Sequence, residues 1–187
     1  QKRYGGLSCS ITEPVTAGSA VCPRFTFSLG ASGLQPGGAL RLAWRWPFDW
    51  GPLQEDNPQA AGHIRVTSTA EADFALDYPV RGDLNPWHHH IGITLKRGHL
   101  HPGDSVYLDC GAPPLGWQAP TFAVASWDFI GLFNADSGTD WICLSGPGAV
   151  PLVPGPAQRL VVVGPSLAQV GQPLVWTVRG EDKWGNP

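Results

Sequence analysis

Residues 24–46 have the sequence RFTFSLGASGLQPGGALRLAWRW, which carries the clearest structural signal in the chain. Every second residue from Phe25 to Leu29 is apolar, and this period of two predicts a strand with one buried face. Residues 34–40 (LQPGGAL) follow, where Pro-Gly sets a tight turn. A second apolar-alternating run occupies residues 39–46. The stretch therefore predicts two strands joined by a turn.

The same combination of strand and turn recurs along the chain. Residues 100–106 (LHPGDSV) repeat the turn at 34–40, and residues 170–174 (VGQPL) are a weaker version of it. Strands are predicted over residues 24–29, 39–46, 63–68, 91–96, 105–109 and 121–126. Short strands separated by turns are typical of a β-sandwich, so we expect an all-β protein with a sandwich over residues 1–153.

The composition of the 187 residues excludes several classes of protein. The 24 glycines and 19 prolines leave few places for a long helix, and 42% hydrophobic residues are enough for a folded core. The net charge is −3 and the sequence has no run of Lys or Arg, so we do not expect a nucleic-acid partner. No stretch approaches the roughly 20 apolar residues of a membrane span, and none is expected.

The four cysteines are Cys9, Cys22, Cys110 and Cys143, and they form no CxxC pair. An even number without metal-type spacing favours disulfides over a zinc or thioredoxin-like site. Three pairings exist, and proximity in the sequence favours Cys9 with Cys22 and Cys110 with Cys143. We therefore expect a secreted or periplasmic protein. Four buried free thiols are the alternative.

A proline-dense segment, residues 150–156 (VPLVPGP), follows the predicted sandwich. It is unsuited to a central strand and predicts an extended linker, which we place at residues 154–156. Residues 157–187 contain two further strand signals, at 159–163 and 174–178. Because two strands cannot bury a face alone, we expect an incomplete immunoglobulin-like segment. The remainder of a longer chain or another protein subunit would cover it.

A series of short motifs follows a fixed order: PVTAGS at 14–19, LRLAWRW at 40–46, DWGPLQ at 49–54 before NP at 57–58, NPW at 85–87, the turn at 100–104, GWQ at 116–118 before TF at 121–122, VPGP at 153–156 and EDKWGNP at 181–187. In this order the chain resembles the N-terminal region of large bacterial proteins grouped under a domain of unknown function. Their later part looks like a metal-dependent phosphoesterase of the polymerase-and-histidinol-phosphatase (PHP) type. The resemblance implies a sandwich followed by an immunoglobulin-like module, with the metallohydrolase ligands beyond Pro187. The cysteines and the histidine-rich run depart from the family's pattern.

Two groups of histidines, residues 88–90 and residues 99 and 101, are candidate metal ligands, because neutral imidazole commonly binds zinc or copper. If residues 91–96 form a strand, roughly 23 Å separates the two groups, and a single five-histidine site is excluded. His88 with His90, or His99 with His101, can form a chelating pair at i, i+2. Zinc or copper on these four residues is one hypothesis, and surface or packing histidines are the alternative.

The nine tryptophans raise the hypothesis of carbohydrate binding, because exposed indole rings stack on sugar faces. Trp50, Trp87 and Trp117 lie in Gly- or Pro-flanked loops and are the candidate ligand-binding residues. Trp44, Trp46 and Trp176 are expected in the core. Carbohydrate binding predicts a coplanar row of exposed rings that includes at least one of the three loop tryptophans.

Residues 134–140 (NADSGTD) alternate oxygen-bearing side chains around a glycine, as the first half of a calcium loop does. The twelfth position, Ser145, lacks the bidentate Glu of such a loop. An Asx-rich turn is therefore expected, with calcium as the alternative.

The sequence has no Gly-x-Ser-x-Gly elbow and no phosphate-cradling loop. Carboxylate pairs such as Asp73 with Asp77 or Glu55 with Asp56 carry no sign of burial. We therefore expect a non-catalytic accessory or structural binding module, without a required cofactor, in a larger secreted protein resembling a metallohydrolase or in an extracellular assembly. The alternatives are a carbohydrate-binding module and a histidine-based zinc or copper protein.

Overall fold

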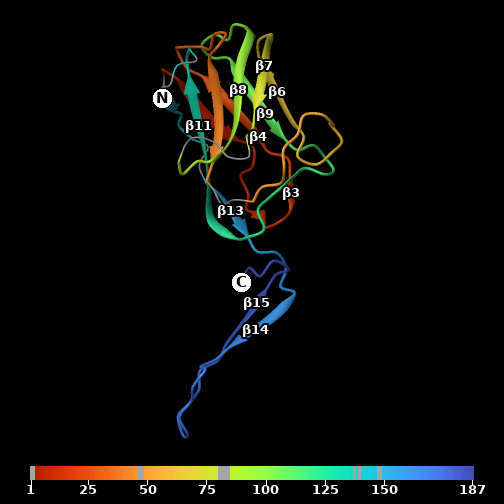
Figure 1. The fold of residues 1–187 in the computed structure, drawn as a ribbon, viewed down its shortest axis with the longest axis vertical. Coiled ribbons are helices and arrows are strands. Elements are labelled where there is room, and N and C mark those ends of the chain that lie inside the picture. The colour runs from red at the N-terminus through yellow and green to blue at the C-terminus, as the bar shows by residue number, and fades with distance from the viewer. Residues whose placement is uncertain (1–2, 46–48, 80–84, 137, 139, 147–148) are drawn as a thin grey trace.

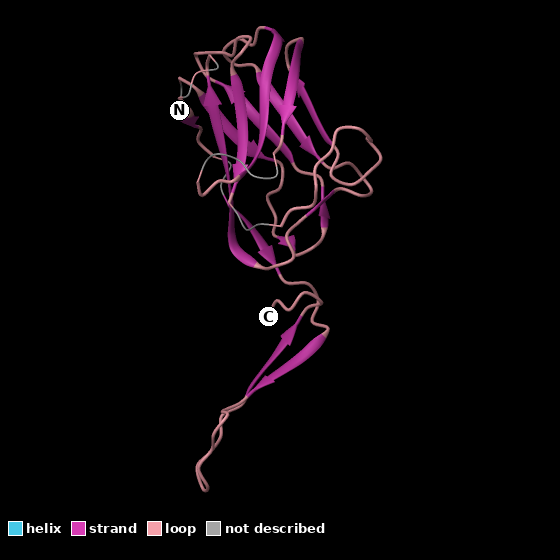
Figure 2. Cartoon of the chain, in the orientation of Figure 1, coloured by secondary structure: helices cyan, strands magenta, loops and turns pink. Residues whose placement is uncertain are grey.

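The computed structural model describes residues 3–45, 49–79, 85–136, 138, 140–146 and 149–187. Across these residues the chain forms strands, turns and loops without a helix, so the protein is all-β, as predicted (Figure 2). The strands build a two-layered body from which a separate hairpin extends (Figure 1). The described part of the chain accordingly has no helix that is long and apolar enough to cross a bilayer.

The first sheet has four antiparallel strands in the order β1 (Gly5–Cys9), β4 (Arg24–Leu29), β9 (Ser105–Cys110) and β6 (Ile64–Ser68). In β4 the side chains of Phe25 and Phe27 are fully buried, whereas Arg24 and Ser28 are exposed. The strand predicted at residues 24–29 is therefore confirmed, together with its buried face.

The second sheet is wider and centres on one long strand. Its order is β2 (Val15–Thr16), β13 (Ala149–Val153), β11 (Val124–Asn134), β5 (Ala39–Trp44), β8 (His89–Gly98) and β7 (Ala72–Asp77), and β12 (Ile142–Cys143) also pairs with β11. The beginning of β11 pairs with β13, and its later residues pair with β5 and β12. A short pair, β3 (Ala20–Val21) with β10 (Trp117–Gln118), lies outside both sheets.

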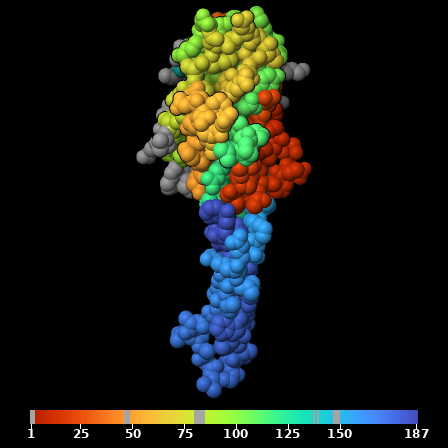
Figure 3. Space-filling model, turned by 90° about the vertical axis from the view of Figure 1, so that its right-hand side faces the viewer, coloured from red at the N-terminus to blue at the C-terminus, as the bar shows by residue number. Residues whose placement is uncertain are grey.

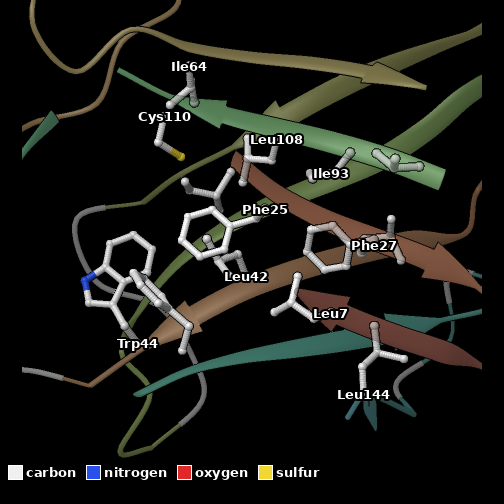
Figure 4. Close-up of a cluster of buried hydrophobic side chains, with 14 of the residues drawn as sticks. Leu7, Phe25, Phe27, Leu42, Trp44, Ile64, Ile93, Leu108, Cys110 and Leu144 are labelled. Atoms are coloured by element: carbon white, nitrogen blue, oxygen red, sulfur yellow. The ribbon is translucent and has the colours of Figure 1, made fainter. Parts of the chain in front are cut away.

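The hydrophobic core fills the space between the two sheets (Figure 4). Phe25 of the first sheet meets Phe129 of the second edge to face, with ring centroids 4.6 Å apart. Alternating residues of both layers point into this space because side chains of a strand alternate between its two faces. The labelled core residues include Leu7, Phe27 and Leu108 from the first sheet and Leu42 and Ile93 from the second.

The proline-dense segment contains a strand, and this corrects the sequence analysis. Residues 150–153 belong to β13, which lies between β2 and β11 instead of forming an extended linker. Pro151 has no N–H to donate, so an uninterrupted ladder would exclude it. The ladder with β11 is interrupted by a register shift between Val124 and Trp127, opposite Pro151. This bulge explains how a proline lies within an internal strand.

Residues 154–158 join the last strand of the sandwich to the hairpin of β14 (Arg159–Val163) and β15 (Thr177–Glu181). The hairpin extends away from the body, and its tip continues the extension (Figures 1 and 3). β14 coincides with the predicted strand at 159–163, whereas β15 begins three residues later than predicted. The immunoglobulin-like character of residues 157–187 stays a prediction.

Candidate functional site

The two faces of the hairpin differ in chemistry. Cross-strand pairing places Leu160 opposite Gly180 and Val162 opposite Val178, and these residues share one face. The ring of Trp176 lies over Gly164 on the same face, because a Cβ added to Gly164 would meet that ring at 2.4 Å. We call Leu160, Val162, Trp176 and Val178 the apolar face of the hairpin.

This apolar face is open to solvent. Leu160 is 75% exposed, Trp176 58%, and Val162 and Val178 are 56% and 59% exposed. A contiguous set of large exposed apolar side chains is costly in water and marks an interaction surface in soluble proteins. Among the described residues, neither strand of the hairpin has a second neighbour, so both edges also present unpaired backbone groups.

Ions rather than apolar side chains occupy the base of the opposite face. The Glu181 carboxylate accepts hydrogen bonds from Arg159, with Nε at 2.7 Å, and lies 2.6 Å from Nη2 of Arg179. The hydrogen bond from Arg159 lowers the pKa of Glu181, burial opposes this, and Arg179 adds to the lowering. The two faces therefore differ most at the base of the hairpin, since the charged face continues towards the tip with Val161 and with Val163, which is 54% exposed.

A buried carboxylate fixes the base of the hairpin to the sandwich. Asp182 is 2% exposed and accepts four hydrogen bonds of 2.9 Å, from the backbone N–H groups of Gly155, Trp184 and Asn186 and from Nδ2 of Asn186. Burial raises the pKa of Asp182, but these hydrogen bonds outweigh it and hold the pKa well below its ordinary value. The carboxylate is therefore ionised over the whole neutral range.

Asn186 connects the base of the hairpin to the residues just before β11 of the second sheet. Its Oδ1 accepts a hydrogen bond from the backbone N–H of Ala123 at 2.7 Å, and its Nδ2 donates to the carbonyl of Thr121 at 2.9 Å. Trp184 adds an aromatic contact, since a Cβ on Gly18 would lie 2.4 Å from its Nε1. Residues 181–187 thus form a docking turn that holds the hairpin at a defined place on the sandwich.

All four cysteines are free thiols, and no two of them lie at disulfide distance. The pairings favoured by the sequence are therefore not formed. Cys110 points into the core of the first sheet, whereas Cys143 pairs with Leu132 in the second. Distance along the chain does not report which sheet a residue joins, and this is why the prediction is wrong.

Cys9 and Cys110 come nearer to one another, but one strand separates them. Cys9 in β1 lies opposite Phe25 in β4, and Phe25 lies opposite Leu108 in β9. Two strand spacings of about 4.8 Å exceed the Cα separation that a disulfide allows. Burial raises the pKa of Cys9 and, well above its usual range, that of Cys110. Neither thiol is activated as a nucleophile.

The candidate metal ligands lie at the two ends of β8. His90 is buried, with Nε2 3.4 Å from a carboxylate oxygen of Asp77, and His88 precedes the strand. His99 and His101 follow its other end, with ring centroids 4.6 Å apart. Within the described residues, His, Cys, Asp and Glu side chains do not form a group of three or more that could hold a metal ion.

The loop at residues 134–140 uses its side chains for internal hydrogen bonds. Asn134 Oδ1 accepts from the backbone N–H of Asp136 at 3.1 Å, and its Nδ2 donates to the carbonyl of Gly138 at 2.6 Å. Asn134 is also buried. These are the bonds of the expected Asx-rich turn, although residues 137 and 139 lie outside the described residues.

The three loop tryptophans do not form a row of exposed rings. Trp117 is fully buried and donates a hydrogen bond from Nε1 to the carbonyl of Gly51 at 2.8 Å. Trp50 is half-buried, with its ring centroid 4.0 Å from those of both Trp117 and Trp127. Trp87 is half-buried beneath the guanidinium of Arg45. Trp44 is buried as expected, Trp176 is exposed, and Trp46 lies outside the described residues.

No protein-family model matches the chain, and no curated protein matches it either. The resemblance to the N-terminal region of PHP-type proteins therefore stays a prediction.

Sequence analysis predicted part of the hairpin surface but not the arrangement of its two faces or the docking turn. It placed two strands at 157–187 and a need for cover over them, from strand count alone. It did not distinguish the apolar face from the charged one, because the register between β14 and β15 depends on the turn that joins them. It also gave no role to Asp182 or Asn186, whose partners lie in residues 121–123 and 155.

Proposed function

We propose that this chain is a non-catalytic binding module that presents the apolar face of its hairpin to a protein partner. The partner is the remainder of a longer chain or another subunit of an extracellular assembly. The observation that carries the proposal is the exposure of Leu160, Val162, Trp176 and Val178 on one face of a hairpin whose base is fixed.

The docking turn supports this proposal because it makes the hairpin a defined part of the molecule. An apolar hairpin on a loose tether would be an aggregation hazard, since two strands alone are marginal in water. Here Asp182 binds Gly155, which follows β13, and Asn186 binds the segment before β11. A partner surface therefore meets the apolar face in one orientation, which reduces the entropic cost of association.

The surface also indicates what kind of partner fits. Apolar side chains on alternating positions of two strands match the inner face of another β-sheet, as in a sandwich. The partner would then be a set of strands with alternating apolar residues, and the Arg159–Glu181–Arg179 face would stay in water. The predicted position next to a metallohydrolase is compatible with such a module, but it rests on the resemblance alone.

Backbone hydrogen exchange tests the proposal in the protein as isolated from its source and in the 187-residue chain. We expect the amides of β14 and β15 to exchange quickly in the 187-residue chain and at least tenfold more slowly in the native protein. The intact mass of the native protein under denaturing conditions shows whether the cover belongs to the same polypeptide. Equal exchange in both samples would refute the proposal.

A matched pair of double variants separates the two faces. Val162→Lys with Val178→Lys places charges on the apolar face, whereas Val163→Lys with Thr177→Lys places them directly beside it on the opposite face. We expect the first pair to abolish the protection of β14 and β15 in the native protein and the second pair to keep it. Loss of protection in both would mean that the hairpin itself, rather than its apolar face, has been disturbed.

The disulfide-based prediction of a secreted or periplasmic location loses its structural support with four free thiols. It remains part of the proposal only through the expected extracellular assembly.

A further inference from the structure

The two histidine pairs at the ends of β8 differ in how accessible they are to an ion in solution. His90 is 4% exposed, and its Nε2 faces the carboxylate of Asp77, so one ring of the first pair is withdrawn from the surface. His99 and His101 are both exposed. Of the two pairs, the second therefore presents both of its imidazoles to solvent.

The residue between His99 and His101 is held in an extended conformation by the segment opposite it. The N–H of Leu34 donates to the carbonyl of Leu100 at 2.8 Å, and the N–H of Leu100 donates back to the carbonyl of Leu34 at 3.0 Å. The side chain of Leu100 is fully buried. Because side chains alternate along extended backbone, His99 and His101 both point to the opposite side, away from the core.

The separation of the two rings suits a shared metal ion. Their centroids are 4.6 Å apart, with an angle of 40° between the ring planes. A metal–nitrogen bond is about 2.0 Å long, so two nitrogens that bind one ion lie at most about 4 Å apart. Since both side chains are exposed, rotation about χ2 can turn one nitrogen of each ring into this span.

Asp104 fixes the backbone of the second histidine and adds a negative charge. Its Oδ2 accepts a hydrogen bond from the backbone N–H of His101 at 2.7 Å, and its Oδ1 accepts one from the hydroxyl of Thr69 at 2.8 Å. The bond from His101, followed by that from Thr69, lowers the pKa of Asp104, so the carboxylate is ionised at neutral pH. Arg97, two residues before His99, is itself paired with Asp73. The surroundings therefore favour a cation.

The two ligands also indicate which metal fits. Among the described residues, the pair has no third His, Cys, Asp or Glu that would complete a metal-binding group. A structural zinc ion takes four protein ligands, and calcium and magnesium take oxygen ligands. Copper(II) binds nitrogen sites more strongly than the other divalent ions of its row, and it accepts a square arrangement in which water fills the remaining positions.

We propose that His99 and His101 chelate one copper(II) ion, with water in its other coordination positions. The structure thus distinguishes between the two i, i+2 pairs of the sequence, because the ring of His90 is buried beside Asp77. The site contains no residue of the apolar face or of the docking turn, so it is independent of the proposed function.

Titration of the whole chain with copper(II) chloride tests the proposal, after the exposed thiols of Cys22 and Cys143 have been alkylated so that they do not compete for the ion. We expect calorimetry to give one ion per chain and electron paramagnetic resonance to show splitting from two nitrogen nuclei. His99→Gln and His101→Gln each leave one imidazole. Because the second imidazole binds intramolecularly, its loss should weaken binding at least about tenfold and leave the splitting of a single nitrogen.

His88→Gln is the matched control, because it removes a histidine of the other pair. Its affinity and its spectrum should equal those of the parent chain, and thermal unfolding checks that all three variants are folded. Unchanged affinity in either His99→Gln or His101→Gln would mean that the ion is held adventitiously, by one imidazole or elsewhere. Loss of binding in His88→Gln would place the ion at the other pair. Either result, or the absence of a bound ion in the parent, would overturn the proposal.

Discussion

The side chain of Asp182 connects the residues before the hairpin with the turn after it, although the two segments are far apart in the sequence. Its carboxylate gathers N–H groups from the residues before the hairpin and from the turn after it. An Asp in the motif EDKWGNP looks like an ordinary surface residue, since charged side chains are seldom buried unless they are hydrogen-bonded. Its importance comes from four donors that only the folded chain brings together.

Acid should loosen the docking turn. The pKa of Asp182 is lowered in the folded chain from an unfolded value of about 3.9, so its stabilising effect is complete above about pH 5. The effect begins to decline as the pH falls below the unfolded pKa, and it is lost fully only as the pH falls through the much lower folded pKa. Thermal unfolding from pH 7 to pH 3 measures this. Asp182→Asn should be less stable than the parent at pH 7, and the difference between the two curves should narrow towards pH 3 without closing. Glu181, also with a lowered pKa, titrates in the same direction in both proteins.

Asp56→Asn is the control for this experiment, because Asp56 is exposed and distant from the turn in the chain. Its curve should follow that of the parent at every pH. A constant difference between the parent and Asp182→Asn down to pH 3 would show that ionisation of Asp182 does not hold the turn.

The state of the thiols can be measured directly. Exposed Cys22 and Cys143 should react with Ellman's reagent in the native protein, whereas fully buried Cys110 should react only after unfolding. Burial also raises the pKa of Cys110, so its reactive thiolate is disfavoured as well. Four thiols should therefore be counted in denaturant without a reductant. A count of zero would restore the disulfide prediction.

At some glycines the space available for a side chain matters as much as the backbone conformation. Gly18 lies in the loop after β2 with φ of +69°, and the indole of Trp184 occupies the place of its Cβ. Gly171, at the tip of the hairpin, has φ of +83° with open space around it. The two glycines share a backbone conformation and differ in their surroundings.

Gly18→Ala should therefore destabilise the docking turn more than backbone strain alone predicts. Both Gly18→Ala and Gly171→Ala incur a left-handed strain of about 1–2 kcal/mol, but only the first displaces Trp184. Chemical denaturation and the exchange rates of amides 182–186 measure the difference. Equal effects of the two substitutions would show that the contact between Gly18 and Trp184 contributes nothing.

The strands differ in how well they could be predicted from their sequence. β4 and β9 were predicted because their buried residues alternate with more exposed ones. β5 and β8 contain consecutive buried residues, and the sequence showed them as apolar runs. β13 was rejected on the strength of its proline, which the bulge opposite it in β11 tolerates. β2, β3, β10 and β12 have two residues each, too few to show any period.

Taken as a whole, the molecule has one core and one appendage. The large buried side chains lie between Leu7 and Leu152, whereas the hairpin beyond Pro156 contributes mainly exposed ones. The sandwich should thus fold without the hairpin.

A chain of residues 1–156 should unfold cooperatively, with a free energy of unfolding about 1.5–4.5 kcal/mol below that of the parent. The loss corresponds to three hydrogen bonds, two between Asn186 and residues 121–123 and one from Gly155 to Asp182, at about 0.5–1.5 kcal/mol each. Near-ultraviolet circular dichroism and denaturant titration give both quantities. A non-cooperative transition would show that the hairpin is needed for the core to form.

Local pattern was enough to establish the all-β class, the turns at 34–40 and 100–106, the buried face of β4 and the presence of two strands within residues 157–187. Each of these follows from the period of a strand or from the conformations that Pro and Gly allow, and both act over a few residues. The partners of the cysteines, the apolar face of the hairpin, the contacts of Asp182 and the stacking of His89 on Trp44 depend on register and on which strands become neighbours. Strand register and strand neighbours are set when distant segments pack against a shared core. The free energy that selects them comes from contacts between those segments, and no single stretch of the chain contains it.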